Sequence, residues 1–284
     1  DLDTDGKTDL LLAGEWMPIR YFRNLGDRFE EKEITGFADS EGWWYSLKSI
    51  DVDQDGDLDI VAGNLGLNYK YRASEASPFE LYANDFDENG SLDIVLSYRK
   101  KGELLPVRGR ECSSEQVPAL ATRFESYQAF AEADLPKLYG QHMLEAALHL
   151  QTKDFSSAWF ENRGEAGFVR HTLPDMAQLS SINAIEVINY NGDQYPDLLL
   201  FGNLYASEVE TPRNDAGVGL VLQGGANGQW TSIPATESGI LVPGDVKQIR
   251  PIKWGPEQKR AFLIGRNDDA LKLLLQNSLV QAVP

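Results

Sequence analysis

The sequence contains a single cysteine, Cys112, and this scarcity limits its chemistry. One thiol cannot form an intramolecular disulfide, and it cannot supply a cysteine-based zinc site. Lys and Arg number 26 against 44 Asp and Glu, and the formal charge of −18 disfavours binding to nucleic acids or anionic membranes. No apolar run approaches the length of a membrane-spanning helix. We therefore expect no nucleic-acid partner and no membrane insertion.

Much of the acidity lies in one repeated pattern. The stretches DLDTDGKTDL (1–10), DVDQDGDLDI (51–60) and DFDENGSLDI (85–94) share side-chain oxygens at positions 1, 3 and 5, glycine at 6 and aspartate at 9. The glycine permits a positive φ, so the loop folds back and turns these oxygens toward one point. An all-oxygen donor set favours a hard cation of calcium size, held at about 2.3–2.6 Å. The alternative, a set of solvated Asp-rich turns, is weakened by three copies with the same offsets.

A fourth, weaker copy is NYNGDQYPD (189–197), which has glutamine at position 6 and only two carboxylates, so its binding of calcium is an open question. Position 7 is predicted to bind through its main-chain carbonyl, with the side chain turned outward. The predicted calcium ligands are Asp1, Asp3, Asp5, Lys7, Asp9, Asp51, Asp53, Asp55, Asp57, Asp59, Asp85, Asp87, Asn89, Ser91, Asp93, Asn189, Asn191, Asp193 and Asp197.

The residues around these loops exclude an EF-hand. That motif needs a bidentate glutamate at position 12 and flanking helices, but position 12 is Leu12, Ala62 or Leu96. The loops are instead followed by short apolar runs such as IVAG, and the second loop is preceded by the alternating stretch WWYSLKSI. The repeating unit is therefore strand, metal loop, strand.

The segments between the loops predict hairpins. PIRYFRNLGDRFEEKEI (18–34), SAWFENRGEAGFVRHTL (157–173) and GLVLQGGANGQWTSIP (219–234) each place a short turn between two strands. The 50-residue interval between the first two loops fits a four-stranded unit, and the last unit has a basic loop that cannot hold a metal. We expect one domain over 1–284, with units that begin near 1, 43, 78, 181 and 243.

These units resemble the FG-GAP repeat of integrin α-subunits, called the VCBS repeat in bacterial proteins, and DVDQDGDLDIVAGNLG carries the resemblance. GNLGLNYKYRAS and LLLFGNLYASEVETPRNDAGVGLVL look like Bacteroidetes-type members and extend it over nearly the whole chain. The resemblance implies an all-β fold: a β-propeller of four-stranded antiparallel blades, with calcium in the loop between the first two strands of a blade. About five blades are visible, and because the chain starts inside a metal loop we expect a fragment of a larger ring.

The resemblance also implies a secreted, outer-membrane or cell-surface protein. Calcium loops of this class fill only where calcium is about millimolar, and this too favours an extracellular location.

Residues from about 107 to 147 depart from the blade plan. They are rich in Ala, Glu and Leu at helical spacing, and they predict two or three short helices. Ser113 with Gln116 resembles a capping box, Asp134 is a candidate N-cap of a turn that ends at Gly140, and Pro118 limits the first helix. This helical insertion is either an interaction surface or lid, or a segment that packs against the blades.

Two functions fit these features. The favoured one is a non-catalytic binding module or scaffold for a glycan or protein ligand, and the alternative is a carbohydrate-active enzyme of the polysaccharide lyase type. A lyase needs a base near an arginine or a metal. His142, His149 and His171 show no recognisable partner spacing, so they are expected to be surface or strand residues. The sequence contains no nucleophile elbow, P-loop or H-E-x-x-H motif.

Aromatic residues are the candidate ligand contacts. If exposed on one face of the ring, they could stack on sugars or hold a peptide, but each could instead fill space between blades. The residues concerned are Trp16, Trp43, Trp44, Tyr45 and Tyr205.

Overall fold

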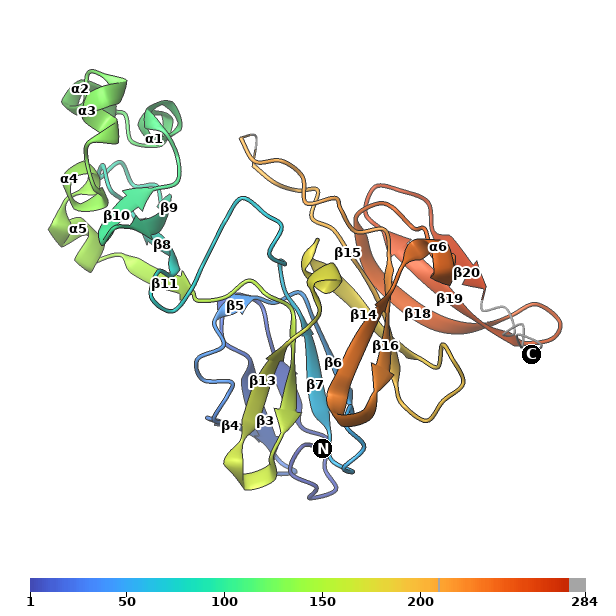
Figure 1. The fold of residues 1–284 in the computed structure, drawn as a ribbon. Helices are drawn as coiled ribbons and strands as arrows, with labels where there is room; N and C mark the ends of the chain where they lie inside the picture. The colour runs from blue at the N-terminus through green and yellow to red at the C-terminus, as the bar shows by residue number, and fades with distance from the viewer. Residues whose placement is uncertain (209, 276–284) are drawn as a thin grey trace. The chain divides into compact units, whose positions relative to one another are not determined.

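Antiparallel strands make up most of the regular structure. The computed structural model describes residues 1–208 and 210–275, which form mostly sheet with a few short helices, and the all-β class is confirmed. The chain divides into two compact units, where the sequence predicts one domain (Figure 1). The first unit contains residues 1–39, 43–70 and the chain from 155 onward, and the second contains 40–42 and 71–154.

The described residues of the first unit form four sheets of three or four strands and one short pairing. The first sheet has the order β1-β3-β4, with β1 (Leu10–Leu12), β3 (Arg20–Asn24) and β4 (Phe29–Lys32). The second has the order β13-β12-β7-β6, with β6 (Ser46–Ile50), β7 (Asp59–Gly63), β12 (Ala158–Asn162) and β13 (Phe168–Thr172). β2 (Glu15–Met17) pairs with β5 (Gly42–Trp43).

The other two sheets of the first unit are formed by the C-terminal half of the chain. The third has the order β14-β15-β16-β17, with β14 (Ile182–Ile188), β15 (Asp197–Gly202), β16 (Leu220–Gly225) and β17 (Gln229–Ile233). The fourth has the order β18-β19-β20, with β18 (Val246–Trp254), β19 (Lys259–Arg266) and β20 (Lys272–Leu275). Short helical turns are η1 (Gly164–Ala166), η2 (Asp175–Gln178), η3 (Ala226–Gly228) and α6 (Ala235–Ser238).

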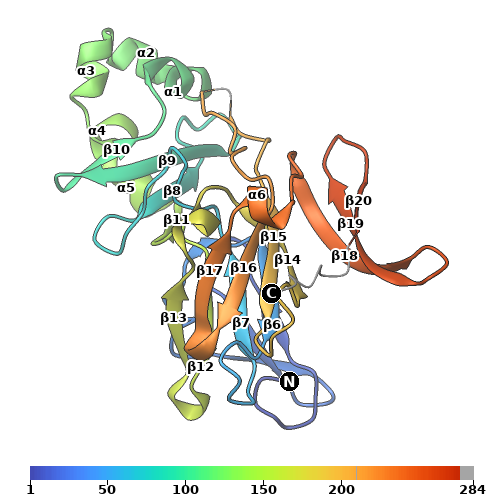
Figure 2. The ribbon, with the colours of Figure 1, turned by 45° about the vertical axis from the view of Figure 1, so that its right-hand side comes forward.

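The inner strands of these sheets are buried on both faces. In β7, Ile60 and Ala62 pack toward the first sheet, whereas Val61 packs toward the third. In β15, Leu198 packs toward the second sheet and Leu199 toward the fourth. The sheets therefore stack face to face, and Figures 1 and 2 both show β6 and β7 beside the sheet of β14–β17. Because both faces are buried, the sequences of these strands are continuously apolar. Each fully buried large apolar side chain contributes roughly 1.5–3 kcal/mol to the free energy of unfolding.

The second sheet joins segments that lie far apart in the sequence. β12 pairs antiparallel with β7, with Ala158 opposite Ala62, and β13 completes the sheet. Where the chain leaves and returns, the backbone N–H of Gly66 donates to the carbonyl of Phe155 at 2.8 Å. The unit that begins near 43 is thus completed by the hairpin 158–172. The strands near 78 do not begin the next unit of this stack; they belong to an insertion, and the expected insertion of 107–147 is only its helical part.

The second unit contains a sheet of its own, in the order β10-β9-β8-β11. Its strands are β8 (Phe79–Asn84), β9 (Asp93–Lys100), β10 (Glu103–Pro106) and β11 (Leu148–Thr152). Its helices are α1 (Arg110–Gln116), α2 (Ala119–Arg123), α3 (Tyr127–Ala131), α4 (Leu135–Tyr139) and α5 (Gln141–Glu145). Tyr82 and Val95 of the sheet form one buried cluster with Leu120, Leu135 and Leu138 of the helices. The insertion therefore has its own core.

The helix signals of the insertion are confirmed in part. The side chain of Asp134 caps α4 by accepting from the backbone of Lys137 at 3.0 Å, and Gly140 ends that helix. Ser113 is not a cap, because it lies inside α1, which begins after Gly109. A cap that the sequence analysis missed is Ser126, at the start of α3. The described chain has more helices here than the two or three expected, because each is limited to one or two turns.

Two of the singled-out aromatic residues are internal. Trp43 and Trp44 are 8% and 3% exposed, so they fill space within the first unit. Trp16 packs edge-on against Trp43, with ring centroids 5.1 Å apart, while Tyr45 and Tyr205 are partly exposed. The space-filling alternative is confirmed for Trp43 and Trp44. Among residues 1–208 and 210–275, none of the helices has the length and apolar character required to cross a membrane.

Candidate metal centres

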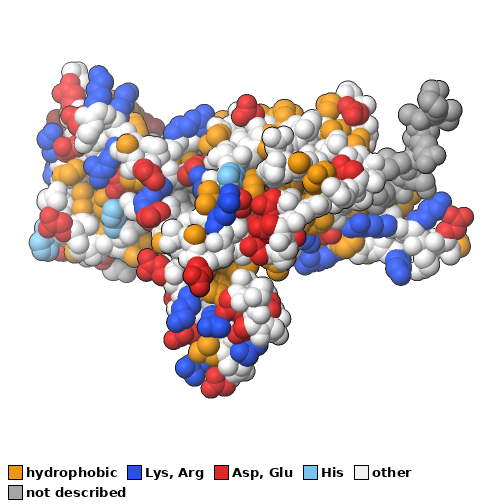
Figure 3. Space-filling model, turned by 60° about the horizontal axis from the view of Figure 1, so that its bottom comes forward, with side chains coloured by type: hydrophobic (Ala, Val, Ile, Leu, Met, Phe, Trp, Pro, Cys, Tyr) orange, Lys and Arg blue, Asp and Glu red, His pale blue; other side chains and the backbone are white. Residues whose placement is uncertain are grey.

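The four acidic loops occupy equivalent places in their sheets. Loop 1 (1–9) precedes β1, loop 2 (51–59) joins β6 to β7, loop 3 (85–93) joins β8 to β9, and loop 4 (189–197) joins β14 to β15. Figure 3 turns the lower end of Figure 1 toward the viewer and shows acidic side chains gathered there, with lysines and arginines nearby. Each of loops 2, 3 and 4 thus lies between two strands, which is the arrangement that the sequence predicts.

Loops 1 to 3 share a backbone path that explains their glycines. The position 6 residues Gly6, Gly56 and Gly90 have φ of +86°, +100° and +88°, and a Cβ there would meet no atom within 4 Å. Glycine is needed for its conformation, then, and not because space is short. Position 4 has a positive φ in all four loops, at Thr4 (+58°), Gln54 (+67°), Glu88 (+57°) and Gly192 (+82°). Loop 4 differs at position 6, where Gln194 does not have a positive φ.

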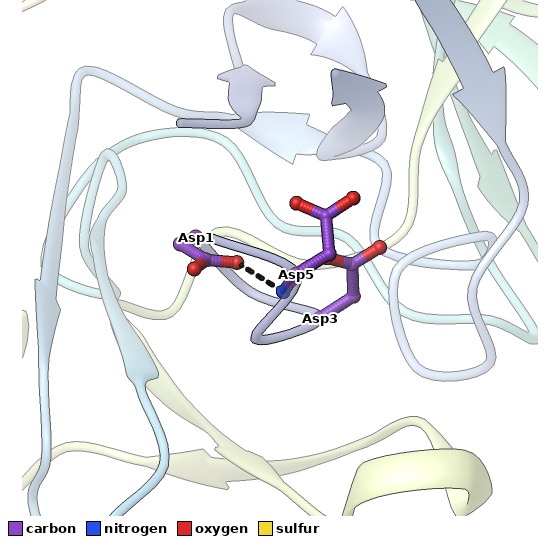
Figure 4. A group of neighbouring side chains, drawn as sticks. All are labelled: Asp1, Asp3 and Asp5. Atoms are coloured by element: carbon purple, nitrogen blue, oxygen red, sulfur yellow. Dashed lines mark hydrogen bonds between the residues drawn. The ribbon is translucent and has the colours of Figure 1, made fainter. Parts of the chain in front are cut away.

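The loop carboxylates accept hydrogen bonds from backbone N–H groups of their own loops. Asp1 accepts from the backbone nitrogens of Asp5 (3.0 Å) and Gly6 (2.8 Å), and Figure 4 shows its carboxylate facing the Asp5 nitrogen on the inside of the turn. In loop 2, Asp51 accepts from Gln54 (2.8 Å) and Gly56 (3.1 Å). These bonds leave lone pairs on the carboxylate oxygens, since each oxygen offers two.

Three of the loops bring carboxylates together as a metal site requires. Within each group, one oxygen per residue lies within 4.8 Å of the others. The groups are Asp1, Asp3 and Asp5; Asp51, Asp53 and Asp59; and Asp85, Asp87 and Asp93. Asp9 and Asp55 lie outside their groups. The side-chain Oδ1 of Asn89 accepts from the backbone nitrogen of Ser91 at 2.8 Å.

The position 9 aspartate has a second role that the sequence analysis missed. Asp59 is fully buried, and its two oxygens accept from the backbone nitrogens of Val52 in the loop and Asn162 at the end of β12, each at 2.8 Å. Asp9 bonds Leu2 (2.8 Å) and Asn24 of β3 (2.9 Å) in the same way. This carboxylate therefore ties the metal loop to the strand that pairs with the strand after the loop.

Loop 2 carries negative charge that its protein neighbours do not offset. Burial raises the pKa of Asp59 to about 6, although the two backbone N–H groups oppose the shift. Burial, and then the charge of Asp55, raise the pKa of Asp53 above its ordinary value. In loop 3, Oδ1 of Asp87 is buried with no hydrogen-bond partner in the described part of the chain. Raised carboxylate pKa values and a bare buried oxygen both fit a cation as the absent neighbour.

Loop 1 differs because cationic side chains already lie against it. Lys7 Nζ is 3.1 Å from Asp5 Oδ2, and Arg23 Nε is 2.5 Å from Asp3 Oδ2. The hydrogen bond from Lys7 is the main reason that the pKa of Asp5 lies below its ordinary value. The side chain of Lys7 thus returns to the loop, which differs from the predicted outward orientation.

The predicted outward orientation of position 7 is also wrong for Asp57. Its Oδ1 is buried without a hydrogen-bond partner among the described residues, and the residue lines a cleft with Asp3 and Tyr21. Burial, followed by repulsion from Asp55, raises the pKa of Asp57 to about 6. Ser91 in loop 3 is exposed as expected.

The polar side chains of loop 4 form hydrogen bonds within the loop. Asn191 Nδ2 donates to Asp193 Oδ2 at 2.6 Å, and Asn189 Nδ2 donates to the Asp193 carbonyl at 3.0 Å. Asp197 still ties the loop to its sheet, accepting from Tyr190 (2.5 Å) and from Gly224 of β16 (2.8 Å). Within the described residues no group of three metal-binding side chains forms here.

The loops and strands of the first sheets correspond to a known repeat. Residues 1–62 match the family model of the FG-GAP-like repeat. The match contains loops 1 and 2 and most of β7, so it supports the FG-GAP part of the resemblance. A comparison with curated proteins finds no match for the chain.

Outside the FG-GAP-like loops, two histidines bond buried glutamates. His171 Nε2 on β13 lies 2.8 Å from Glu161 Oε2 on β12, and His149 Nε2 on β11 lies 2.7 Å from Glu80 Oε2 on β8. Both lie on strands as expected, but the sequence analysis missed their partners. The signal was present in the hairpin 157–173, because its register sets His171 opposite Trp159, two residues from Glu161.

Proposed function

We propose that the stacked sheets are blades of a β-propeller with calcium in its loops, acting as a non-catalytic binding module or scaffold for a glycan or protein ligand. The observation that carries this proposal is a group of three carboxylates in each of three loops, placed before the strand that enters a sheet core. The FG-GAP-like match of residues 1–62 supports it. Calcium, when bound, supplies the positive charge that these carboxylates lack, and the carboxylates hold it by their oxygens.

The proposed setting is extracellular or at the cell surface. Loops with three or four carboxylates and a partly exposed position belong with modules that bind calcium at about 10⁻⁴–10⁻³ M. Such sites fill at millimolar calcium and stay empty at the far lower calcium of a cytoplasm.

Calcium stoichiometry tests the proposal. Isothermal titration of the full chain should show three sites, one for each carboxylate group. Asp53→Ala should lower the number by one, whereas Asp193→Ala in loop 4 should leave it unchanged. Asp27→Ala is the matched control, because Asp27 is an exposed carboxylate outside the loops. A chain that binds no calcium, or that loses the same number of sites in all three variants, would contradict the proposal.

A second function is favoured by one specific observation. His171, Arg163 and the loop 2 residue Asp53 line the same cleft, and a lyase needs a base beside a cation. In that mechanism His171 removes the proton from the carbon next to the carboxylate of a uronic acid unit. The electron pair forms a carbon–carbon double bond, and the bond to the glycosidic oxygen breaks as that oxygen takes up a proton. Incubation with uronic acid polysaccharides tests it, because the unsaturated product absorbs in the ultraviolet. Product formation that depends on His171 would replace the non-catalytic proposal.

A further inference from the structure

A cleft of about 830 Å³ lies between the hairpin β12–β13 and the hairpin β16–β17 of the first unit. Loop 2 contributes Asp53 and Asp55 to its lining, and the turn η3 contributes Gly228. The cleft is within the volume range of small-molecule binding sites. It adjoins the carboxylate group of loop 2 and shares Asp53 with it.

An ion pair with a buried glutamate forms one wall of this cleft. The Glu161 side chain is only 9% exposed, with Arg163 at 2.6 Å and His171 at 2.8 Å from its two oxygens. Arg163 is more than half exposed and His171 is 40% exposed, so both present polar groups to the cleft. The charges of Glu161 and Arg163 offset one another, so this wall offers hydrogen bonds without net charge.

Indole rings form the rest of the wall. His171 stacks on Trp159 with ring centroids 4.5 Å apart, and Gly228 lies so close that a Cβ there would be 2.5 Å from the same indole. Trp159 is thereby fixed between the two hairpins. Trp230 also lines the cleft, and its indole N–H is buried with no hydrogen-bond partner among the residues that the structure describes. This nitrogen is closed off from solvent, so the cleft presents the exposed part of the Trp230 ring rather than its N–H group.

The surrounding side chains indicate the class of ligand. Thr172, Gln229 and Thr231 line the rim and are exposed, and each can both donate and accept. A ligand that matches them presents hydroxyl groups, which also donate and accept. Asp53 and Asp55 make the site unfavourable for anions, because the five aspartates of loop 2 exceed the charge of one calcium ion.

We propose that this cleft binds an uncharged oligosaccharide, with hydroxyl groups bonded to Arg163, His171 and Gln229 beside the indole ring of Trp230. This inference rests on the proposed binding function and names its site and ligand class. Because loop 2 forms one wall, calcium removal should weaken sugar binding as well as the loop.

The second unit contains a matched control. Glu80 pairs with Arg99 (2.8 Å), accepts from the Tyr82 hydroxyl (2.8 Å) and lies 2.7 Å from His149, which stacks on Tyr82. This repeats the arrangement of glutamate, arginine, histidine and aromatic ring. Its cleft has Glu103, Asp134 and Glu145 in the lining in place of indoles. His149→Ala therefore removes the same kind of bond and ring contact as His171→Ala, away from the proposed site.

The experiment measures binding of malto-, cello-, xylo- and mannohexaose to the full chain in millimolar calcium, with hexagalacturonate as the charged comparison. At least one neutral hexaose should bind, and hexagalacturonate should bind more weakly. His171→Ala and Gln229→Ala should each weaken the best neutral ligand by about tenfold, the loss expected for one hydrogen bond. Gln229 is exposed on β17, so its removal should leave the fold intact.

Each outcome decides the inference. Equal loss in His149→Ala, or full binding in both cleft variants, would place the sugar elsewhere and overturn the inference while the binding function stands. Binding of none of the hexaoses, or tighter binding of hexagalacturonate, would also overturn it, and calcium stoichiometry would still test the proposed function separately. Cleavage of a neutral hexaose that is lost in His171→Ala would support the site and overturn the non-catalytic part of the proposed function.

Discussion

Replacing Asp59 should destabilise the first unit in two separable ways. Its carboxylate belongs to the loop 2 group, and it also accepts from the buried backbone nitrogens of Val52 and Asn162. Asp59→Ala removes both acceptors. A buried donor left without an acceptor costs about 1–3 kcal/mol, so two donors set the loss at about 2–6 kcal/mol even without calcium. When calcium is present, the variant also loses the stabilisation that the ion bound in loop 2 provides.

Asp55→Ala is the matched comparison. Asp55 is exposed, and it accepts from the exposed backbone nitrogen of Asp57 (3.1 Å). Its removal should change the stability of the calcium-free protein by no more than about 0.5 kcal/mol. Because Asp55 lies outside the loop 2 carboxylate group, the variant should lose with calcium at most what one filled site provides, about 1.4 kcal/mol at 1 mM calcium for a dissociation constant near 10⁻⁴ M.

Tryptophan fluorescence during urea unfolding is a suitable assay. All six tryptophans belong to the first unit, so their fluorescence reports the unfolding of that unit. Each variant is unfolded in 1 mM calcium and in chelator, and Asp59→Asn, which keeps one acceptor oxygen, should fall between wild type and Asp59→Ala. If Asp59→Ala in chelator were as stable as Asp55→Ala, the proposed link between loop and sheet would be wrong.

Three further predictions follow from the same contacts. Arg23→Gln removes the cation beside Asp3 and should tighten calcium binding at loop 1, measured by titration, whereas weaker binding would show that Arg23 orders the loop for the metal. The pKa of Asp59 is raised from 3.8 to about 6, so the folded calcium-free protein holds a proton that the unfolded chain releases, and its stability falls as pH rises through this range. Calcium binding strengthens over the same range, so the difference in urea midpoint between calcium and chelator should widen from pH 5 to pH 7, and a narrowing would contradict this. Replacing 71–154 by a short glycine linker should leave the tryptophan transition cooperative and remove one calcium site, and loss of that transition would mean that the first unit needs the insertion.

The local chemistry of the site could be predicted from sequence because it depends on residues a few positions apart. Alternating carboxylates and a glycine at position 6 are enough to specify a turn with inward oxygens, and Gly56 adopts the expected positive φ. In loop 4 an amide at positions 1 and 3 brings donors where a cation needs acceptors, so calcium binding by this weaker copy stays an open question. The orientation of Asp57 could not be predicted, because it depends on a neighbouring sheet.

The pairing of distant strands was the part that sequence could not supply. β7 and β12 are both short apolar strands, and any later apolar strand could have paired with β7 on pattern alone. Loop 3 has the same offsets as loops 1 and 2, so the sequence predicts it as part of the next unit of the same stack. Its strands have their own helical core, and only the register of β12 against β7 reveals where the interrupted sheet resumes.

The position 9 aspartate explains how one sheet tolerates this interruption. In loops 1, 2 and 4 the same carboxylate bonds the strand that pairs with the strand after the loop, at Asn24, Asn162 and Gly224, and loop 4 does so without a metal-binding group in the described chain. The bond to this neighbouring strand therefore does not depend on a metal-binding group. In the second sheet, Asp59 fixes the end of β12 and the Gly66–Phe155 hydrogen bond fixes the other side of the junction. Hydrogen bonds to Asp59 and Gly66 hold the two ends of the segment that contains β12. The register of β12 against β7 therefore does not depend on the length or structure of the intervening chain.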